Sequence, residues 1–245
     1  MSQQKKNITV VIPAYKADKT LPEVLERIPG KVYDEISNIV IVEDGGTNHP
    51  QSVSNQLKQK YSKIEIIWHP TNRGYGAAQK TGFARALELG ADVGVLLHAD
   101  GQYAPEEMER LYQPLINEQA DVVLGSRMHD RRSALKGGMP LYKLIANISL
   151  TQLENFCYGM KVSEYHSGYM LYSRKALETI PFQKLSDTFH FDGEMLLLSG
   201  KKNLRIADLP IPTHYGDEVS HLKPIEYGFD VLKIIARNFM GKYDF

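Results

Sequence analysis

Short runs of β-branched and aliphatic residues recur along this chain, and each is followed by polar residues and then by a stretch with apolar residues at helical spacing. Uniformly apolar runs of this length are typical of strands that are buried on both faces. Strands that alternate with helices form a parallel sheet, so the pattern predicts an α/β fold. The predicted strands are 8–12, 38–42, 64–68, 93–97 and 121–124.

Helices are predicted where apolar residues recur on one face of a segment. The segment from Lys19 to Ile28, for example, places Leu21, Val24 and Leu25 on the same side. A proline followed by acidic residues, as at 105–107, is typical of a helix start. The other predicted helices run from about 76 to 89, from 105 to 117, from 139 to 158 and from 224 to 240.

Two segments of the second half have less certain roles in the sequence. Residues 129–138 are polar, basic and glycine-rich, which predicts a mobile loop, either a lid beside an anionic ligand or a segment without order in the free protein. The 139–158 helix is apolar at helical spacing, and Lys143 is its only basic residue. This favours core or homodimer packing over a peripheral membrane contact, since an interfacial anchor normally has a cationic face.

Composition narrows the class of protein. The chain has 245 residues, 42% of them hydrophobic, and can bury a core for one domain spanning 1–245. Its 29 basic and 29 acidic residues balance, which argues against a nucleic acid partner. The single cysteine, Cys157, excludes an internal disulfide and fits a reducing compartment. No stretch has the form of a signal peptide or transmembrane segment, so we expect a cytoplasmic protein that touches a membrane only at its inner face.

The strand at 93–97 is followed at once by His98-Ala99-Asp100-Gly101-Gln102. In open α/β sheets, ligands bind at the edge where such strands end. The Asp100 carboxylate and the Gln102 amide oxygen are hard ligands that suit Mg²⁺ or Mn²⁺ holding a diphosphate. The alternative is a polar turn in which Asp100 only caps the following helix.

Two further segments place polar groups at the same sheet edge. Glu43 and Asp44 end the second strand, and ligand binding is favoured there over a capping role because they lie at the same edge as Asp100. The GYGAA segment at 74–78 follows the third strand. It is not a dinucleotide fingerprint, because it does not follow the first strand and because Gln79 stands where a third small residue is needed.

Several segments, in order, resemble the inverting glycosyltransferases of family 2, and most closely the polyprenyl-phosphate branch that contains dolichyl-phosphate mannose synthase. The resemblance covers about residues 8–225 and implies a GT-A fold with a mixed, mainly parallel sheet flanked by helices. It implies a nucleotide-sugar half at about 8–120 and an acceptor half at about 121–245. The matching segments are VIPAYKAD, IVEDGGTN, NRGYGAA, HADGQY, GSR at 125–127, EYHSGYMLYSR, FHFDGEM and RIADLPIPTH.

The resemblance implies roles for residues at the donor site. Pro13, Ala14 and Tyr15 are expected to line the nucleobase, and Asp44, with Glu43 beside it, to accept a hydrogen bond from the base or ribose.

The phosphate side of the donor site is implied in the same way. Gly74 and Gly76 begin a helix that faces the donor, and small residues there allow a close approach to phosphate. Arg127 is expected to stabilise charge on the leaving diphosphate. The metal signature, with the pattern Asp-Ala-Asp-x-Gln in relatives, falls on His98-Ala99-Asp100, with Asp100 and Gln102 as metal ligands.

At the acceptor side, the resemblance makes Asp192 the first candidate for a general base and Glu194 the second. His98 and Met170 stand where the relatives carry Asp and Arg, and His214 stands in a loop where lipid-phosphate enzymes bind phosphate. His214 is still expected to contact the diphosphate. Because a neutral imidazole cannot replace the permanent charge of arginine, these departures leave the acceptor open between a lipid phosphate and a glycan hydroxyl.

The function implied is inverting transfer of a hexose from a UDP- or GDP-sugar to a polyprenyl phosphate or a glycan hydroxyl, in cell-envelope or polysaccharide biosynthesis. A divalent ion, Mg²⁺ or Mn²⁺, would neutralise the leaving diphosphate. A sugar nucleotidyltransferase is disfavoured, because the first strand is not followed by a glycine-rich basic loop. The alternative is a non-catalytic nucleotide-sugar-binding protein of the same fold.

Overall fold

The computed structural model describes residues 5–45, 51–213 and 224–245, and within them a seven-stranded sheet in the order β3-β2-β1-β4-β6-β5-β7. The order confirms the predicted α/β class, and the sheet is mixed because β6 runs antiparallel to both of its neighbours. The strands are β1 (Ile8–Ala14), β2 (Ile36–Asp44), β3 (Ile64–His69), β4 (Val93–Leu96), β5 (Val122–Ser126), β6 (Tyr169–Ser173) and β7 (Ile206–Pro210).

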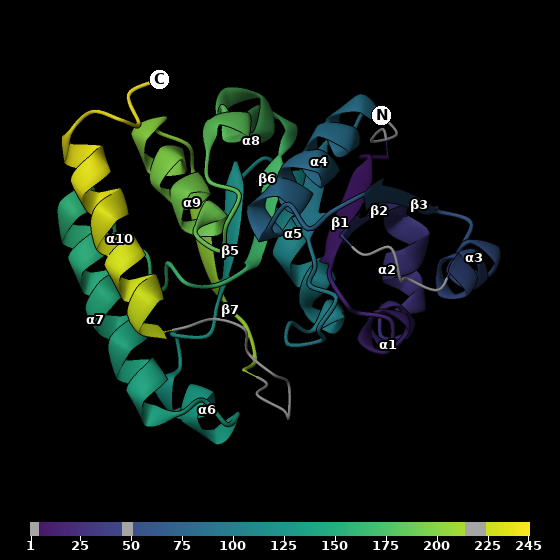
Figure 1. Ribbon diagram of the computed structural model, residues 1–245, viewed down its shortest axis with the longest axis horizontal. Helices are drawn as coiled ribbons and strands as arrows, with labels where there is room; N and C mark the ends of the chain where they lie inside the picture. The colour runs from purple at the N-terminus through teal and green to yellow at the C-terminus, as the bar shows by residue number, and fades with distance from the viewer. Residues whose placement is uncertain (1–4, 46–50, 214–223) are drawn as a thin grey trace.

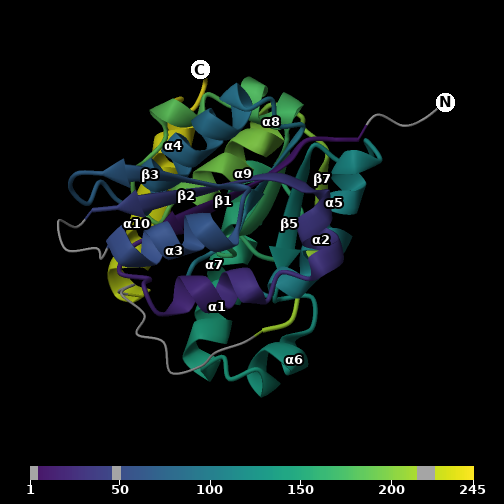
Figure 2. The same cartoon turned by 90° about the vertical axis from the view of Figure 1, so that its right-hand side faces the viewer.

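Helices cover both faces of this sheet (Figure 1, Figure 2). Alternate residues of β1 point to opposite faces, so Val10 and Ile12 pack with α1, α2 and α5, whereas Val11 packs with α4, α8 and α9. The helices are α1 (Thr20–Glu26), α2 (Gly30–Glu35), α3 (Gln51–Lys60), α4 (Tyr75–Glu88), η1 (Pro105–Glu107), α5 (Met108–Ile116), α6 (Arg131–Lys136), α7 (Leu141–Tyr158), α8 (Arg174–Thr179), η2 (Phe182–Lys184), α9 (Phe191–Lys201) and α10 (Pro224–Phe239).

The antiparallel strand β6 brings a distant part of the chain to the edge where β1, β2, β4 and β5 end. Val95 of β4 pairs with Leu171, and Gly125 of β5 pairs with Tyr169. Because β6 runs in the opposite direction, the residues just before it lie at the carboxyl edge of its neighbours, and the β4 register continues to place Gly168 opposite His98. The two predicted halves therefore share one sheet.

The prediction of a mobile loop at 129–138 is wrong for its central part, which forms the short helix α6. The Asp130 side chain caps this helix by accepting hydrogen bonds from the backbone amides of Arg132 and Ser133 at 2.9 and 3.1 Å. Ala134 is buried and packs with Met139. The glycines at 137 and 138 follow the helix instead of interrupting it, which is where glycine is favoured.

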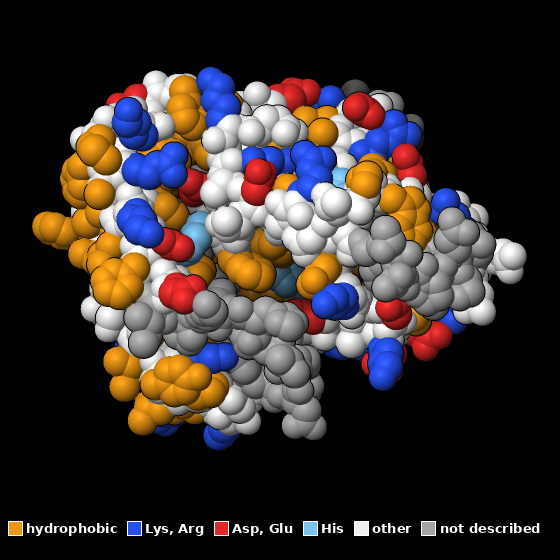
Figure 3. Space-filling model, viewed as in Figure 1, with side chains coloured by type: hydrophobic (Ala, Val, Ile, Leu, Met, Phe, Trp, Pro, Cys, Tyr) orange, Lys and Arg blue, Asp and Glu red, His pale blue; other side chains and the backbone are white. Residues whose placement is uncertain are grey.

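The long helices α7 and α10 lie side by side at one end of the molecule (Figure 1). Only one side of α7 is buried, and the space-filling view shows apolar side chains along this end of the protein (Figure 3). In the described part of the chain, no helix combines the length and apolar character needed to span a bilayer. The exposed large apolar side chains here are Leu141, Tyr142, Ile145, Leu153, Phe156, Phe229, Leu232, Phe239 and Met240.

The contact of α4 with β1 depends on Gly82, where an added Cβ would lie 2.2 Å from Val11 Cγ1. We expect Gly82→Ala to lower the free energy of unfolding by about 1–3 kcal/mol, because the buried valine has to shift. Gly228→Ala on α10 is the matched control. It meets nothing within 4 Å and should be neutral or stabilising. Urea unfolding of both variants checks this, and equal stability of Gly82→Ala and the unchanged protein would contradict it.

Candidate functional site

A cavity of about 1130 Å³ opens at the sheet edge where β1, β2 and β4 end. It brings together most of the residues that the sequence singled out, although they come from segments far apart in the chain. Glu43, Gly76 and Glu194 do not line it, and His214 lies outside the described residues. The predicted residues that line it are Pro13, Ala14, Tyr15, Asp44, Gly74, His98, Ala99, Asp100, Gln102, Arg127 and Asp192.

Asp44 is held by three contacts from the chain itself. Its carboxylate accepts hydrogen bonds from the backbone amides of Arg73 and Gly74 at 2.9 and 2.8 Å, and Nδ1 of His69 lies 2.7 Å away. His69 pairs with Asp44 in the register of β2 and β3. Asp44 therefore fixes the loop before α4 at the wall of the cavity, and its predicted contact with the base or ribose stays a prediction.

The glycines before and in α4 allow a close approach of another chain segment. Gly74 has φ 104°, and an added Cβ there would lie 2.3 Å from the carbonyl oxygen of Asp187. The Gly76 amide donates to that same carbonyl at 2.9 Å, and a Cβ at 76 would lie 2.4 Å from the Ser186 carbonyl. This contact with 186–187 accounts for the small residues, and the Gly76 amide is engaged by protein rather than open to a phosphate.

The group predicted to bind metal lies in the cavity wall. The Asp100 side chain is 45% exposed, and one of its oxygens accepts a hydrogen bond from the backbone amide of Gln102 at 3.0 Å. His98 Nδ1 lies 4.0 Å from the other oxygen. The described residues contain no cluster of three or more His, Cys, Asp and Glu side chains that could hold a metal. A few protein donors beside a diphosphate are nevertheless the usual environment of Mg²⁺ in nucleotide sites, so these side chains fit such an ion.

Asp192 is buried in the cavity wall, where it accepts two hydrogen bonds. Gln79 Nε2 donates to Oδ1 and the Tyr75 hydroxyl donates to Oδ2, each at 2.9 Å. Burial raises the pKa of Asp192 to about 7, although these hydrogen bonds act in the opposite direction. Sequence reasoning missed Tyr75 and Gln79. The signal was present, since both lie one turn apart on the same face of α4 and Gln79 is an unexpected polar residue there.

Tyr75 connects Asp192 to the segment that is predicted to bind metal. Its hydroxyl lies 2.6 Å from His98 Nε2, and the two rings pack edge to face. Gly168 makes room for the imidazole, because a Cβ at that position would lie 2.4 Å from Nε2. Burial, the largest cause, lowers the pKa of His98; Arg127 lowers it further, whereas Asp100 and a backbone hydrogen bond with Gly168 oppose the change. The ring is therefore held in the neutral form.

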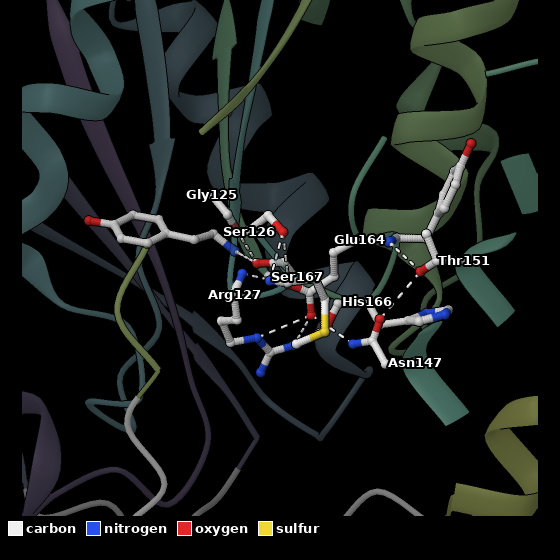
Figure 4. Close-up of polar contacts among 12 residues, drawn as sticks. Gly125, Ser126, Arg127, Asn147, Thr151, Glu164, His166 and Ser167 are labelled. Atoms are coloured by element: carbon white, nitrogen blue, oxygen red, sulfur yellow. Dashed lines mark hydrogen bonds and ion pairs between the residues drawn. The ribbon is translucent and has the colours of Figure 1, made fainter. Parts of the chain in front are cut away.

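Arg127 is fixed by a buried carboxylate. Its backbone amide and Nε donate to Glu164 at 2.8 and 3.1 Å, and its guanidinium also donates to the carbonyl of His166 at 2.7 Å (Figure 4). Asn147 donates to the same carboxylate. Burial raises the pKa of Glu164, but Arg127 and Asn147 outweigh it and the pKa is lowered. The guanidinium is thereby held at the cavity wall.

Glu194 and Met170 lie away from the cavity. The Glu194 carboxylate accepts hydrogen bonds from the Ser186 amide at 2.7 Å and the Tyr243 hydroxyl at 2.5 Å. This placement does not support the predicted role of Glu194 as a base, because its side chain is buried behind the segment that contacts α4. Met170 is buried in the core on the face of the sheet that α4, α8 and α9 cover, so its departure from the family pattern does not change the cavity wall.

The raised pKa of Asp192 predicts a pH dependence of stability. The unfolded state releases this proton near the ordinary value of 3.8, whereas the folded state keeps it until about pH 7. Stability from this group is therefore complete below about pH 4 and is lost as the pH rises through 7, with a slope approaching about 1.4 kcal/mol per pH unit.

Asp192→Asn removes that titration and keeps an oxygen acceptor. Unfolding by urea at a series of pH values should therefore show the variant gaining stability relative to the unchanged protein between pH 5 and 7. Parallel pH profiles for the two proteins would show that Asp192 is ionised throughout.

Comparison with known proteins adds to this geometry. Across 97% of this chain and 98% of the relative, the sequence is 30% identical to the UDP-N-acetylglucosamine–dolichyl-phosphate N-acetylglucosaminyltransferase of Methanococcus voltae. It is 26% identical to the polyprenol monophosphomannose synthase of Mycolicibacterium smegmatis, over 82% of this chain and 75% of that protein.

The fold has a close counterpart among solved structures. Glucosyl-3-phosphoglycerate synthase from Mycobacterium tuberculosis, in complex with Mn²⁺, UDP and phosphoglyceric acid, superposes with a TM-score of 0.62 at 18% identity. The match covers 94% of this chain and 76% of that one and shows the same GT-A architecture. Residues 9–181 match the sequence pattern of glycosyl transferase family 2. The chain belongs to glycosyl transferase family 2.

Proposed function

We propose that this chain transfers a hexose, with inversion, from a nucleoside-diphosphate sugar to the phosphate of a polyprenyl phosphate. The observation that carries the proposal is one continuous cavity. It extends from the strand-end residues around Asp100 to the α7 side chains Tyr142, Ala146 and Leu150. The first end has the polar groups that suit a nucleotide and its diphosphate, and the second end suits an apolar chain. Both named relatives act on a lipid-linked phosphate.

The donor proposed first is UDP-N-acetylglucosamine, because the Methanococcus voltae relative that uses it aligns over nearly the whole of both chains. Pro13, Ala14 and Tyr15, at the end of β1, are proposed to line the base. Asp100 and Gln102 would hold Mg²⁺ or Mn²⁺, which would neutralise charge on the leaving diphosphate. Arg127, at the end of β5, is proposed to stabilise the same negative charge, and its hydrogen bonds to Glu164 hold the guanidinium in place.

Whether Asp192 acts as a general base depends on the acceptor. A phosphate oxygen is already anionic, so attack on the sugar from the face opposite the diphosphate needs no general base, and the anomeric carbon inverts. A glycan hydroxyl would need one, and Asp192, with a pKa of about 7, would then suit the task. The apolar end of the cavity favours the phosphate of a lipid.

The exposed apolar side chains of α7 and α10 support a site of action at a membrane surface. Tyr142 belongs both to this exposed face and to the cavity wall, so the two are continuous. An isoprenoid chain that enters the cavity from a bilayer would pass along this face. A second copy of the chain is the other occupant that the face would suit.

The proposal predicts transfer of labelled N-acetylglucosamine from UDP-N-acetylglucosamine to a short-chain polyprenyl phosphate in detergent, in the presence of Mn²⁺. Asp100→Ala should lower the rate at least about 100-fold, because charge stabilisation by the metal is worth several kcal/mol. Glu178→Ala is the matched control, since it removes an exposed carboxylate on α8 that does not line the cavity.

Analysis of the lipid product by mass spectrometry identifies the acceptor. GDP-mannose and UDP-glucose in parallel reactions test the choice of donor. Binding of UDP with no transfer and no donor hydrolysis, across these donors, would instead favour the non-catalytic alternative.

A further inference from the structure

Two features of the cavity are not used by transfer to a phosphate. One is the buried carboxylate of Asp192, which has no acceptor proton to remove. The other is His98, an imidazole at the place where a carboxylate would be the usual partner of Asp100. Tyr75 joins the two, since its hydroxyl lies 2.9 Å from Asp192 Oδ2 and 2.6 Å from His98 Nε2.

When Asp192 is ionised, the hydrogens in this chain of contacts fix the tautomer of the imidazole. The Tyr75 hydroxyl has one hydrogen, and it donates this hydrogen to Asp192, whose other oxygen is occupied by Gln79. Tyr75 can therefore only accept from His98, so Nε2 carries the ring hydrogen of the neutral imidazole. The bare nitrogen is then Nδ1, which faces Asp100 at 4.0 Å.

We propose that His98 Nδ1 is a ligand of the divalent ion beside Asp100, and that Asp192, acting through Tyr75, is a positioning residue that keeps this nitrogen free of hydrogen. The arrangement has the logic of the carboxylates that orient metal-binding histidines in other proteins, with a tyrosine hydroxyl inserted between the two groups. The inference rests on the proposed donor site, but not on which acceptor receives the sugar.

Gly168 supports the same assignment, because it lies at the Nε2 edge of the imidazole and not at Nδ1. A Cβ there would lie 2.4 Å from Nε2 and 2.6 Å from Cε1, so the glycine lets this edge of the imidazole pack directly against the backbone just before β6. Tyr103 packs on the ring edge to face, with centroids 4.7 Å apart. The imidazole is thus confined, with Nδ1 on the side of Asp100.

A nitrogen ligand has a consequence for metal selectivity. Imidazole suits transition metals, whereas Mg²⁺ strongly prefers oxygen. The site should therefore favour Mn²⁺ over Mg²⁺ in the presence of UDP. His98→Asp should shift the preference back towards Mg²⁺.

The direct test is pulsed electron paramagnetic resonance of Mn²⁺ bound to the full chain with UDP, which detects nitrogen bound to the metal. The unchanged protein should show nitrogen coupling, and His98→Asp should bind Mn²⁺ without it. Asp192→Leu should lose the coupling and weaken Mn²⁺ binding about 10- to 100-fold. Without its acceptor, Tyr75 would donate to Nε2 and leave the ring hydrogen on Nδ1.

Two further variants separate positioning from a general loss of structure. Adding Tyr75→Phe to Asp192→Leu removes the hydroxyl that would donate to Nε2. The double variant should therefore restore part of the nitrogen coupling. Asp192→Asn should keep the coupling and the affinity, since its amide oxygen can still accept from Tyr75 while its nitrogen donates to Gln79 Oε1, which has no hydrogen-bond partner among the described residues.

The outcomes are distinguishable. Mn²⁺ bound with UDP but without nitrogen coupling would overturn the inference and leave the donor site standing. No binding of Mn²⁺ with UDP would overturn both. Nitrogen coupling that persists unchanged in Asp192→Leu would assign the ligand to His98 but overturn the positioning role. Loss of transfer in Asp192→Asn with metal binding intact would show that Asp192 also acts as a base, and it would overturn the phosphate acceptor proposed above.

Discussion

The pairing of β6 between β4 and β5 is the interaction on which the site depends. Because β6 is antiparallel, the chain just before it reaches the edge where the parallel strands end. That places Gly168 against His98, and Glu164 against Arg127. Without this strand, the donor edge would lack its fixed arginine and the support of its imidazole. Main-chain hydrogen bonds of the sheet thus set the positions of side chains that are distant in sequence.

The buried carboxylates around the cavity act mainly on the protein itself. Asp44 holds the loop before α4, Glu164 holds Arg127, and Glu194 holds the segment at Ser186. Each of these buried acids accepts more than one hydrogen bond, as polar groups taken out of water require. The segment at 186–187 then packs against Gly74 and Gly76. Hydrogen bonds between these segments therefore hold the wall of the cavity together.

The strands could be predicted from the sequence because each is a short apolar run, and their polar ends followed from the direction of a parallel sheet. Predicting the helix α6 was not possible from composition, since its stability comes from the Asp130 cap and the burial of Ala134. The link between Tyr75 and Asp192 was also hidden. These residues are 117 positions apart, and the sequence pattern around each of them does not predict the contact. Gln79 stands out in the sequence as a polar residue among small ones, but its partner Asp192 could not be predicted.

The departures from the polyprenyl-phosphate pattern have different physical meanings once they are placed in the fold. Met170 is buried in the core and removes no charge from the cavity. His98 does change the site, because a neutral imidazole beside Asp100 leaves one carboxylate near the proposed metal where the pattern has two. A dication held by one carboxylate keeps a net positive charge and attracts a diphosphate more strongly than one that is already neutralised.

The stronger attraction between the proposed metal and the diphosphate would compensate for a weaker electrostatic contribution from Arg127. Its charge is largely balanced by Glu164, so it acts as a directed hydrogen-bond donor more than as a free cation. With the proposed ion bound, the replacement at 98 would leave more of the positive charge of the site on the metal. A site of this kind depends more on its ion, and less on arginine, for holding the leaving group.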